Sequence, residues 1–414
     1  MSADIDVVIV GAGAAGIAAA RRLAPTMLSV LLIEATARVG GRASTCNIAN
    51  MPLDLGCEWL HSADRNHWTR LAEASGYAID QRDPAWVSQY RDLGFTQTEQ
   101  SAASQAFAAW SARLMSAPPP SDCAADALDP DGEWNAFIEA MSGFISGAAP
   151  NRLSAKDFVA YDEASTDNNW RAPAGYGALI ASSLPRPIDL RLSTPVESIE
   201  LDRKGVKLET PAGAIRARTA LLTVSTAALA GGAIKLPSCL EAWRRAAALL
   251  PLGRNEKAFL EIVGDSPFEP ETHALGNPCD PRTGSYFIRP FGRPVIECFL
   301  GGEGAGIIED AGPAAGFEYA ADQLVALFGS SVRRRLHPLI ATCWGRTTFI
   351  GGAYSYALPG HAAERAVLAR PFEQRIFFAG EATHPHDFST AHGAYHSGFR
   401  AAEEVLAALA PGQL

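Results

Sequence analysis

Three glycines near the N-terminus are the first residues whose spacing points to chemistry. Gly11, Gly13 and Gly16 form a G-x-G-x-x-G pattern, and an acidic residue, Glu34, follows further along the chain. Glycines at this spacing let backbone N–H groups approach a pyrophosphate, and the carboxylate can accept hydrogen bonds from ribose hydroxyls. The spacing alone is a weak signal. It predicts a dinucleotide site only where a strand leads into the glycines and a helix leads out of them.

The segments around these glycines have the required order. An apolar strand is expected over residues 7–10, a helix of small residues continues to residue 23, and a second apolar strand over residues 30–33 ends on Glu34. The helix N-terminus supplies unpaired N–H groups and partial positive charge for phosphates. The N-terminal stretch therefore predicts a Rossmann-type unit that binds a dinucleotide.

A second glycine pair, Gly40 and Gly41, stands directly before Arg42. Glycines expose backbone, and a guanidinium group is a forked donor for phosphate. Beside a dinucleotide site, we interpret this trio as further phosphate contacts. Without the first motif, an ordinary turn with a surface arginine would be the better explanation.

Other candidate residues are ambiguous when each is taken alone. Gly56 interrupts a packable segment, which often marks the close approach of a backbone or a ligand. His61 follows Trp59 in an apolar setting, where a histidine is more often packed than catalytic. Lys257 begins an apolar strand, where a lysine is usually exposed, and Tyr354 follows a glycine pair that lets the backbone pass close to a partner. Their roles depend on what the rest of the chain places around them.

The C-terminal stretch carries a second pattern. A strand is expected over residues 375–379, ending at Gly380 and Glu381, and a long helix begins near Ala391. Small residues on the first turns of this helix would let it lie flush against a planar ligand, and its N-terminus can stabilise negative charge. Close helix packing alone would also explain the small residues.

Composition restricts the class of protein. The chain has 414 residues, 48% of them hydrophobic, so it can bury a large core and form two domains or an interrupted one. A net charge of -10 argues against nucleic acid as a partner, because phosphates require a basic surface. No run of about 18 apolar residues is present, so we expect no membrane anchor. The seven cysteines are scattered without a CxxC pair, which favours free thiols in the cytoplasm over disulfides or a metal site.

The middle of the chain suggests that the dinucleotide domain is discontinuous. Residues 64–150 are expected to form an inserted helical region, and short β segments follow from residue 189. The apolar stretch ALLTVS, residues 220–225, predicts a strand that returns to the buried parallel sheet. We therefore predict an α/β fold with a Rossmann-type domain and a substrate domain of mixed sheet and helices. The expected cofactor domain spans residues 1–75, 175–235 and 341–414, and the expected substrate domain spans residues 76–174 and 236–340.

Taken together and in this order, the motifs resemble the flavin-containing amine oxidase family, which includes monoamine oxidases, polyamine oxidases and flavin-dependent histone demethylases. The resemblance lies in GAGAAG and RVGGR near the N-terminus, PAGYGALI and STPVESIE in the middle, and FAGEATHPHDFSTAHGAYHSG near the C-terminus. Polyamine oxidases are the closest in motif, while residues 64–150 and 260–335 match only in general layout. The resemblance implies that the dinucleotide is FAD.

The resemblance also implies cofactor contacts by position. Ala353 stands where monoamine oxidases carry the cysteine that bonds to the flavin, so non-covalent FAD is expected. The adenine, ribose and pyrophosphate would contact Gly11, Gly13, Ala15, Gly16, Glu34, Ala35, Gly41, Arg42 and Val196. The flavin and ribityl portions would contact Gly56, Cys57, Glu58, Trp59, Trp344, Gly380, Glu381, Thr390 and Ala391.

Four residues have implied catalytic roles. Lys257 falls where the family places a lysine that holds a water against flavin N5. Tyr354 takes the place of one aromatic wall of the amine site, and Thr390 takes the place of the second wall, which is a tyrosine in monoamine oxidases. A threonine there, together with His61 in EWLHS, looks more like the polyamine oxidases.

The implied reaction is oxidation of a C–N bond. A neutral amine would pass a hydride from its α-carbon to flavin N5, the imine would hydrolyse, and O2 would reoxidise the flavin with release of H2O2. The expected substrate is a polyamine or a secondary or cyclic amine. Alternatives on the same scaffold are an L-amino-acid oxidase, with Arg254 and Arg289 as candidate carboxylate ligands, and a carotenoid-type desaturase. A flavin-binding protein without turnover is a third alternative, and the oligomeric state stays open.

Overall fold

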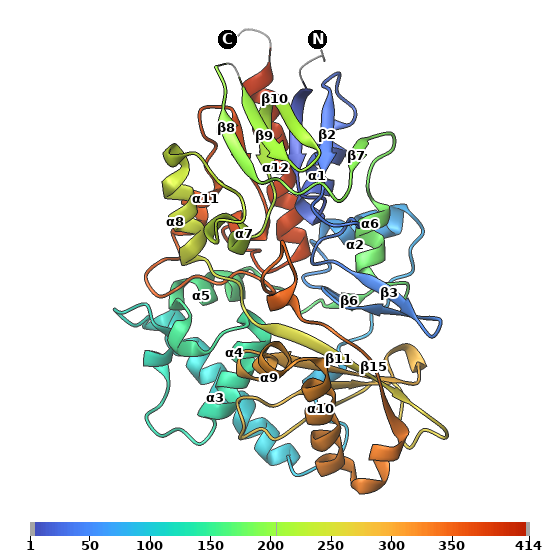
Figure 1. Cartoon of the computed structure of the whole chain (residues 1–414). Helices are drawn as coiled ribbons and strands as arrows, with labels where there is room; N and C mark the ends of the chain where they lie inside the picture. Colours follow the sequence, from blue (N-terminus) through green and yellow to red (C-terminus); the bar gives the residue numbers. More distant parts are fainter. Residues whose placement is uncertain (1–4, 204, 411–414) are drawn as a thin grey trace.

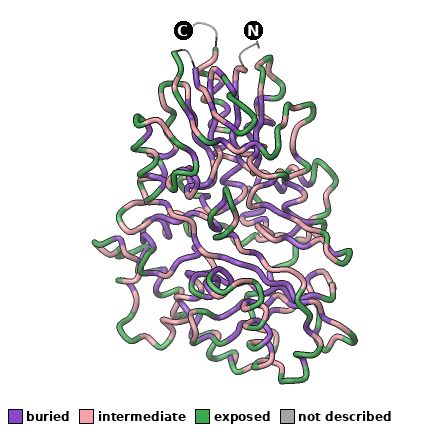
Figure 2. The backbone as a smooth tube through the Cα atoms, in the orientation of Figure 1, coloured by how far each residue is buried: buried purple, intermediate pink, exposed green. Residues whose placement is uncertain are grey.

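The computed structural model describes residues 5–203 and 205–410. Two larger sheets organise this part of the chain, and they lie at opposite ends of the molecule (Figure 1). One contains the first and last strands of the chain, and the other is built from its second half. Buried residues run through the strands of both sheets and through the segments between them (Figure 2). The segments that meet between the two sheets form the candidate site described below.

The seven-stranded sheet is the Rossmann-type unit expected from the sequence. The stretch ALLTVS supplies the end of β10, which pairs in parallel with both β1 and β16, as predicted. The apolar runs of β1 and β2 are buried because both faces of the sheet are covered. The spatial order is β7 (Asp189–Arg191), β2 (Val30–Ile33), β1 (Ile5–Val10), β10 (Gly213–Leu222), β9 (Val206–Thr210) and β8 (Ser198–Leu201), with β16 (Ile376–Phe378) beside the end of β10.

Two helices pack closely on one face of this sheet because glycines remove side chains at their contacts. α1 (Ala14–Leu23) begins directly after the glycine turn, and α12 (Ala391–Leu409) lies against it. A Cβ on Gly398 would lie 2.1 Å from the carbonyl oxygen of Ala15, and one on Gly16 would lie 1.9 Å from that of Gly11. Both positions therefore require glycine.

The opposite face of the same sheet is covered by α7 (Thr226–Ala230), α8 (Glu241–Leu249) and α11 (Glu364–Ala369). Ala246 and Leu250 share a hydrophobic core with Val8 and Leu31 of the sheet. This packing puts α8 with the cofactor sheet, whereas the boundary expected at residue 236 put it in the substrate domain. A change of pattern along the chain does not reveal which sheet a helix covers. We propose that the boundary lies after α8, near residue 251.

The five-stranded sheet is antiparallel, and its second-last strand carries Lys257. Its order is β12 (Thr272–Leu275), β13 (Ser285–Ile288), β14 (Val295–Gly301), β11 (Asn255–Ile262) and β15 (Leu336–Ala341). α9 (Glu303–Ala311) and α10 (Pro313–Phe328) cover this sheet, and Ile308 and Leu324 share a core with Leu260 and Ile296. Lys257 is buried because Asp54, Glu58 and Glu297 surround its side chain, which differs from the exposure usual for a lysine at the start of a strand.

The inserted helical region expected over residues 64–150 contains α2 (His67–Ala74), α3 (Gln97–Ser116) and α4 (Asn135–Ser146), and α5 (Ala155–Ala164) and α6 (Tyr176–Ser182) follow it. Two small hairpin-like sheets, β3 (Thr45–Ile48) with β4 (Met51–Asp54) and β5 (Trp59–Leu60) with β6 (Trp170–Arg171), lie near the junction of the two regions. Within residues 5–203 and 205–410, no helix combines the length and the apolar character that crossing a membrane requires.

Candidate active site

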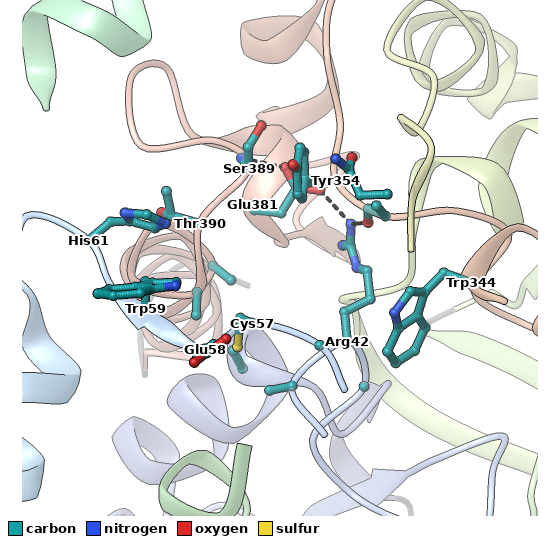
Figure 3. A pocket seen from close by; sticks show the side chains of 18 of the residues that line it. Arg42, Cys57, Glu58, Trp59, His61, Trp344, Tyr354, Glu381, Ser389 and Thr390 are labelled. Atoms are coloured by element: carbon teal, nitrogen blue, oxygen red, sulfur yellow. Dashed lines mark hydrogen bonds and ion pairs between the residues drawn. The ribbon is translucent and has the colours of Figure 1, made fainter. Parts of the chain in front are cut away.

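A continuous cavity of about 770 Å³ connects the two regions of the molecule. Its lining comes from segments far apart in the sequence, including the N-terminal glycine turn, residues 55–62, β11, α4 and residues 389–394. Figure 3 shows part of this lining, with Trp59, His61 and Thr390 on one side and Arg42 and Trp344 on the other. The residues predicted to form the site all line the cavity except Gly16, which packs behind the turn.

The cofactor end of the cavity is formed by backbone. Gly11 has a φ of +103°, and Gly13 precedes α1 without a side chain that caps the helix, so the first N–H groups of α1 stay available. A Cβ on Gly41, whose φ is +59°, would lie 3.3 Å from Gly13 Cα. Any larger side chain on Gly13 would enter the space that it lines. This bare, donor-rich turn fits a pyrophosphate.

Glu34 stands at the end of β2 with its carboxylate turned toward the glycine turn. One oxygen accepts from the Ala12 N–H at 2.9 Å, and the other accepts from the Thr36 N–H and hydroxyl at 2.9 and 2.8 Å. The side chain is buried yet lines the cavity. These contacts fix its orientation and fit the ribose-binding role that the resemblance implies. Thr36 lines the cavity too and was missed, because a threonine after the acid belongs to no motif.

Arg42 links the two ends of the chain. Its guanidinium donates to the Glu381 carboxylate at 2.9 Å and to the Ala353 carbonyl oxygen at 2.5 Å (Figure 3). Burial alone would raise the pKa of Glu381, but Arg42 and Arg365 outweigh it and lower that pKa. Ser355 also donates to Glu381, at 2.7 Å. Glu381 is therefore an ionised anchor that holds Arg42 against the cavity.

The wall that contains Cys57 depends on a close approach of two backbones. A Cβ on Gly56 would lie 1.7 Å from the Arg42 carbonyl oxygen, so the close approach expected at this glycine is to another backbone segment. Burial is the main cause that raises the pKa of the Cys57 thiol, which keeps it protonated. Trp344 lies beside this wall, and its indole N–H donates to the Leu55 carbonyl oxygen at 3.1 Å.

Lys257 lies between two carboxylates. Its Nζ donates to Glu58 at 2.9 Å, to Glu297 at 2.7 Å and to the Asp54 carbonyl oxygen at 3.0 Å. An ammonium group has three N–H donors, and all three are used here. Burial and the nearby Glu58 raise the pKa of Glu297, while Lys257 lowers the pKa of Glu58 against the effect of burial. We infer that the cluster holds one carboxylate, one carboxylic acid and one ammonium, and is neutral as a whole.

Tyr354 and His61 present apolar ring surfaces to the substrate end of the cavity, which we call the chamber. The Tyr354 hydroxyl donates to the Phe144 carbonyl oxygen of α4, and burial raises the pKa of this phenol. His61 Nδ1 lies 2.7 Å from Asn169 Oδ1, and burial lowers the pKa of the imidazole, which favours its neutral form. The hydrogen bonds fix both rings while leaving their faces toward the cavity.

Thr390 is the N-cap of α12. Its hydroxyl accepts from the Gly393 N–H at 3.0 Å and donates to the Asp387 carbonyl oxygen at 2.6 Å. These two bonds explain why a threonine stands at the start of this helix. They also engage the hydroxyl, so Thr390 presents mainly its methyl group and backbone to the cavity.

A histidine cluster next to this cap has a structural explanation. His384, Asp387 and His396 bring possible metal-ligand atoms together. Asp387, however, already accepts from Arg65, and His384 Nδ1 accepts from the Asp387 N–H at 2.8 Å. A metal on His384 Nε2 would require Nδ1 to carry the proton, which conflicts with that bond. The cluster instead ties the turn before α12 to Arg65.

The chamber beyond Tyr354 is apolar and aromatic. α4 contributes one face of it, and the five-stranded sheet contributes another. The acids Asp162 and Asp167 line the cavity only where it meets solvent, since both are exposed. The apolar lining consists of Trp59, Trp86, Phe95, Phe137, Met141, Phe144, Ile145, Phe158, Leu275, Phe287 and Phe299. Apart from Trp59, sequence reasoning missed these residues, because nothing in their local spacing distinguishes them from core residues.

Arg254 and Arg289, the two candidates for binding a substrate carboxylate, do not line the cavity. Arg254 pairs with Glu309 and Asp310 at 2.5 and 2.8 Å, and Arg289 donates to the Phe268 carbonyl oxygen at 2.9 Å. Neither position supports an amino-acid oxidase.

Comparison with known proteins gives a consistent result. Residues 65–406 match the family model described as flavin containing amine oxidoreductase, and residues 9–74 match an NAD(P)-binding Rossmann-like domain. Polyamine oxidase 2 of Arabidopsis thaliana is 27% identical over 452 aligned residues, which cover 96% of this chain and 87% of that protein.

Solved structures share the fold. Cyclohexylamine oxidase from Brevibacterium oxydans IH-35A superposes with a TM-score of 0.75 at 21% identity, covering 97% of this chain and 99% of the other. Putrescine oxidase bound to putrescine gives a TM-score of 0.74 at 18% identity, with the same coverage of the two chains. The protein therefore belongs to the flavin-containing amine oxidoreductase family and is an FAD-dependent enzyme that oxidises amines.

Proposed function

We propose that this enzyme oxidises a cyclic or other largely apolar amine and holds FAD without a covalent bond. The observation that carries the proposal is the continuous cavity, which joins a bare dinucleotide cradle to an aromatic chamber. Of the two substrate classes expected from the sequence, the secondary or cyclic amines fit this chamber better than the polyamines.

We also propose a cytoplasmic location. The scattered cysteines show no disulfide pattern, which is typical of proteins in a reducing compartment.

The distribution of carboxylates supports an apolar substrate. Glu58 and Glu297 are offset by Lys257, and Glu34 and Glu381 belong to the cofactor end. A short diamine would place its second ammonium among aromatic rings without a free carboxylate, and burying an unpaired charge is costly. A ring or an alkyl chain would instead gain apolar contacts. Asp162 and Asp167 at the rim would attract cationic amines from solution without specifying the rest of the substrate.

FAD, when bound, supplies the redox chemistry, in which a hydride leaves the carbon next to the amine nitrogen and the electrons pass on to O2. The chain's own residues orient the amine and exclude water. Tyr354 forms an aromatic wall fixed by its bond to Phe144, and Phe144 and Phe299 extend that wall into the chamber. We assign Tyr354 and His61 to holding the amine, and Thr390 to capping the helix that closes the site.

The apolar chamber also selects the protonation state of the substrate. Desolvation disfavours an ammonium ion, so the site favours the neutral amine. The fraction of neutral amine in solution rises with pH, and the rate of flavin reduction is therefore expected to rise between about pH 6 and pH 9. A rate that stays constant over this range would contradict the assignment.

Lys257 needs a role that agrees with its contacts. A water molecule could accept from Lys257 only by replacing Asp54, Glu58 or Glu297, because these three acceptors use all its donors. We propose that Lys257 chiefly neutralises the single negative charge that Glu58 and Glu297 share in the cavity wall. Lys257→Met would then raise the pKa of Glu58, because its carboxylate would lose the counter-charge. Infrared titration of the carboxyl bands measures this pKa, and an unchanged value would contradict the neutralising role.

Non-covalent FAD is supported by the residues near the expected attachment point. Ala353 has no nucleophilic side chain, and the raised pKa of Cys57 makes its thiol a poor nucleophile. Acid precipitation of the yellow protein should leave the flavin in the supernatant. Flavin that stays with the precipitated chain would show a covalent bond.

The central experiment is anaerobic bleaching of the purified yellow enzyme. Cyclohexylamine, benzylamine and piperidine represent apolar amines, and putrescine and spermidine represent polyamines. We expect the first group to reduce the flavin with an efficiency at least about tenfold higher, since one misplaced buried charge costs more than 1.4 kcal/mol. Preferential bleaching by a polyamine would reverse the substrate assignment, and bleaching by no amine would overturn the proposed function.

A further inference from the structure

We propose that Arg171 is a positioning residue that fixes the aromatic wall of the substrate chamber. Arg171 does not line the cavity, but it lies directly behind Trp59 and Phe287, which do. The inference rests on the proposed function for its meaning, because it concerns how the enzyme distinguishes one amine from another.

The guanidinium of Arg171 is enclosed by aromatic rings. Its central carbon lies 5.1 Å from the Trp59 ring centroid, 4.7 Å from that of Phe287 and 4.3 Å from that of Phe291. Arg171 is 3% exposed, and its Nη1 is buried without a hydrogen-bond partner. A planar cation can stack on several ring faces at once, which a compact ammonium cannot do. The environment thus uses the shape of arginine as well as its charge.

The other side of Arg171 is tied to two acids. Its Nη2 donates to Asp80 at 2.9 Å and to Glu271 at 2.7 Å. The backbone of Arg171 also pairs with Asp80 in both directions, and β6 pairs Arg171 with Trp59 of β5. Three separate parts of the chain therefore meet at this side chain: the strand that carries Trp59, the loop at residue 80, and the outer strands of the five-stranded sheet.

This arrangement determines the position of the chamber wall. Trp59 also contacts Trp86 with ring centroids 4.1 Å apart and Phe287 with centroids 6.0 Å apart. Trp59 and Phe287 belong to different regions of the molecule, and Arg171 contacts both. Loss of the planar group would let the two rings move relative to each other. The consequence would be weaker binding of a bulky amine, with little effect on a small one.

The test uses Arg171→Lys in the FAD-loaded enzyme. A lysine keeps the positive charge beside Asp80 and Glu271, so the variant should fold, but it cannot stack flat on the rings. We expect the apparent Kd of cyclohexylamine, measured by anaerobic flavin reduction, to rise about tenfold, the size of one cation–π contact. The limiting reduction rate and the Kd of ethylamine should stay within about twofold of wild type.

Two further variants control the experiment. Arg82→Lys changes an exposed arginine that pairs with the same two acids, Asp80 at 2.7 Å and Glu271 at 3.3 Å, but stacks on none of these rings. Arg82→Lys should leave the apparent Kd values of both cyclohexylamine and ethylamine unchanged. Phe291→Leu removes one ring from Arg171 on a side that does not line the cavity, and it should shift the Kd of cyclohexylamine in the same direction as Arg171→Lys.

A spectroscopic measurement tests the inference without substrate. In protein labelled with 5-fluorotryptophan, with Trp59 assigned through Trp59→Phe, the ¹⁹F resonance of Trp59 should shift or broaden in Arg171→Lys and stay in place in Arg82→Lys. An unchanged resonance, or equal weakening of both amines, would overturn the inference. If no amine bleaches the wild-type flavin, the proposed function fails, while the ¹⁹F signal still decides the role of Arg171.

Discussion

The two ends of the cavity are built in different ways. At the cofactor end, Gly11, Gly13, Glu34 and Arg42 come from one stretch of the chain, and most of the contacts on offer are backbone groups. At the substrate end, side chains from α4, α5 and four strands of the five-stranded sheet converge from positions that are far apart in sequence. The glycine cradle of the cofactor end is therefore a local structure, although Val196 and Glu381 complete that end from distant parts of the chain, and the substrate end is a product of long-range packing.

This difference predicts how well each end of the cavity tolerates amino-acid substitutions. A backbone cradle tolerates few substitutions, because its function depends on the absence of side chains at fixed places. A chamber formed by side chains can be altered one ring at a time while the scaffold stays intact. The two ends should therefore respond differently to mutation, and four experiments can sharpen or break the comparison.

The largest effect is expected at the cradle. Gly13→Val would place a branched side chain in the space where the pyrophosphate is expected, so FAD should bind at least about a hundredfold more weakly and the protein should purify colourless. Gly213→Ala serves as a control, because Gly213 in the β9–β10 hairpin does not line the cavity; its φ of +111° means that the substitution strains the backbone, but flavin content should stay at the wild-type level. Flavin content measured by absorbance decides the matter. A yellow Gly13→Val protein would mean that the cradle lies elsewhere.

The next effect is expected from breaking an ion pair that connects the two regions. Asp157 of α5 and Arg365 of α11 form an ion pair at 2.7 Å, and both side chains are at most 3% exposed. Asp157→Asn leaves a buried guanidinium without its charge partner, which should cost about 3 to 5 kcal/mol of unfolding free energy. The exposed pair between Glu318 and Arg333 offers a control, and Glu318→Gln should cost less than about 1 kcal/mol. If urea unfolding shows the same loss of unfolding free energy for Asp157→Asn and Glu318→Gln, the buried ion pair contributes no more to stability than the exposed one.

A smaller effect, confined to the substrate end, is expected from Tyr354→Ala. Loss of this ring should lower kcat/KM about tenfold or more while the flavin content stays at the wild-type level. Tyr356→Ala is the matched control, since Tyr356 belongs to the same loop and is buried but does not line the cavity. Loss of FAD from Tyr354→Ala would contradict the separation of the two ends.

The last comparison concerns a carboxyl group that supports Trp344 and whose effect changes gradually with pH. Burial, and then the nearby Glu309, raise the pKa of Glu256 to about 7, although the carboxylate accepts from Thr342 and from the Trp344 and Gly345 N–H groups. The folded state then binds more protons than the unfolded state between about pH 4.5 and pH 7, so this group lowers the stability as the pH rises through that range.

Glu256→Gln removes this dependence. Relative to the variant, the wild type should lose at most about 1.4 kcal/mol per pH unit over the same range. Urea midpoints at about pH 5 and pH 8 test the slope, and Glu309→Gln should lower the pKa of Glu256 and reduce the slope in part. If the unfolding free energies of wild type and Glu256→Gln change with pH in parallel, the pKa of Glu256 is not raised.

Much of the fold could be predicted from local pattern. β2 has the bounds Val30–Ile33 expected for it, and the return of β10 to the parallel sheet followed from an unbroken apolar run. The place of α8 could not be predicted, because its apolar face has the same pattern whichever sheet it covers. The burial of Lys257 was also hidden, since it depends on Asp54 and Glu58, which come from a distant part of the chain and cover its side chain.

The sequence by itself predicted the glycine cradle of the cofactor end, because a glycine turn, a helix N-terminus and an acid act through backbone geometry over a short stretch of chain. It also indicated which single residues to examine, such as Lys257 and Tyr354. Only the tertiary structure decided what surrounds them: Glu58 and Glu297, which engage Lys257, and the aromatic chamber held by Arg171. The contacts of Lys257 with Glu58 and of Arg171 with Trp59 and Phe287 join residues more than a hundred positions apart, and local spacing carries no record of such contacts.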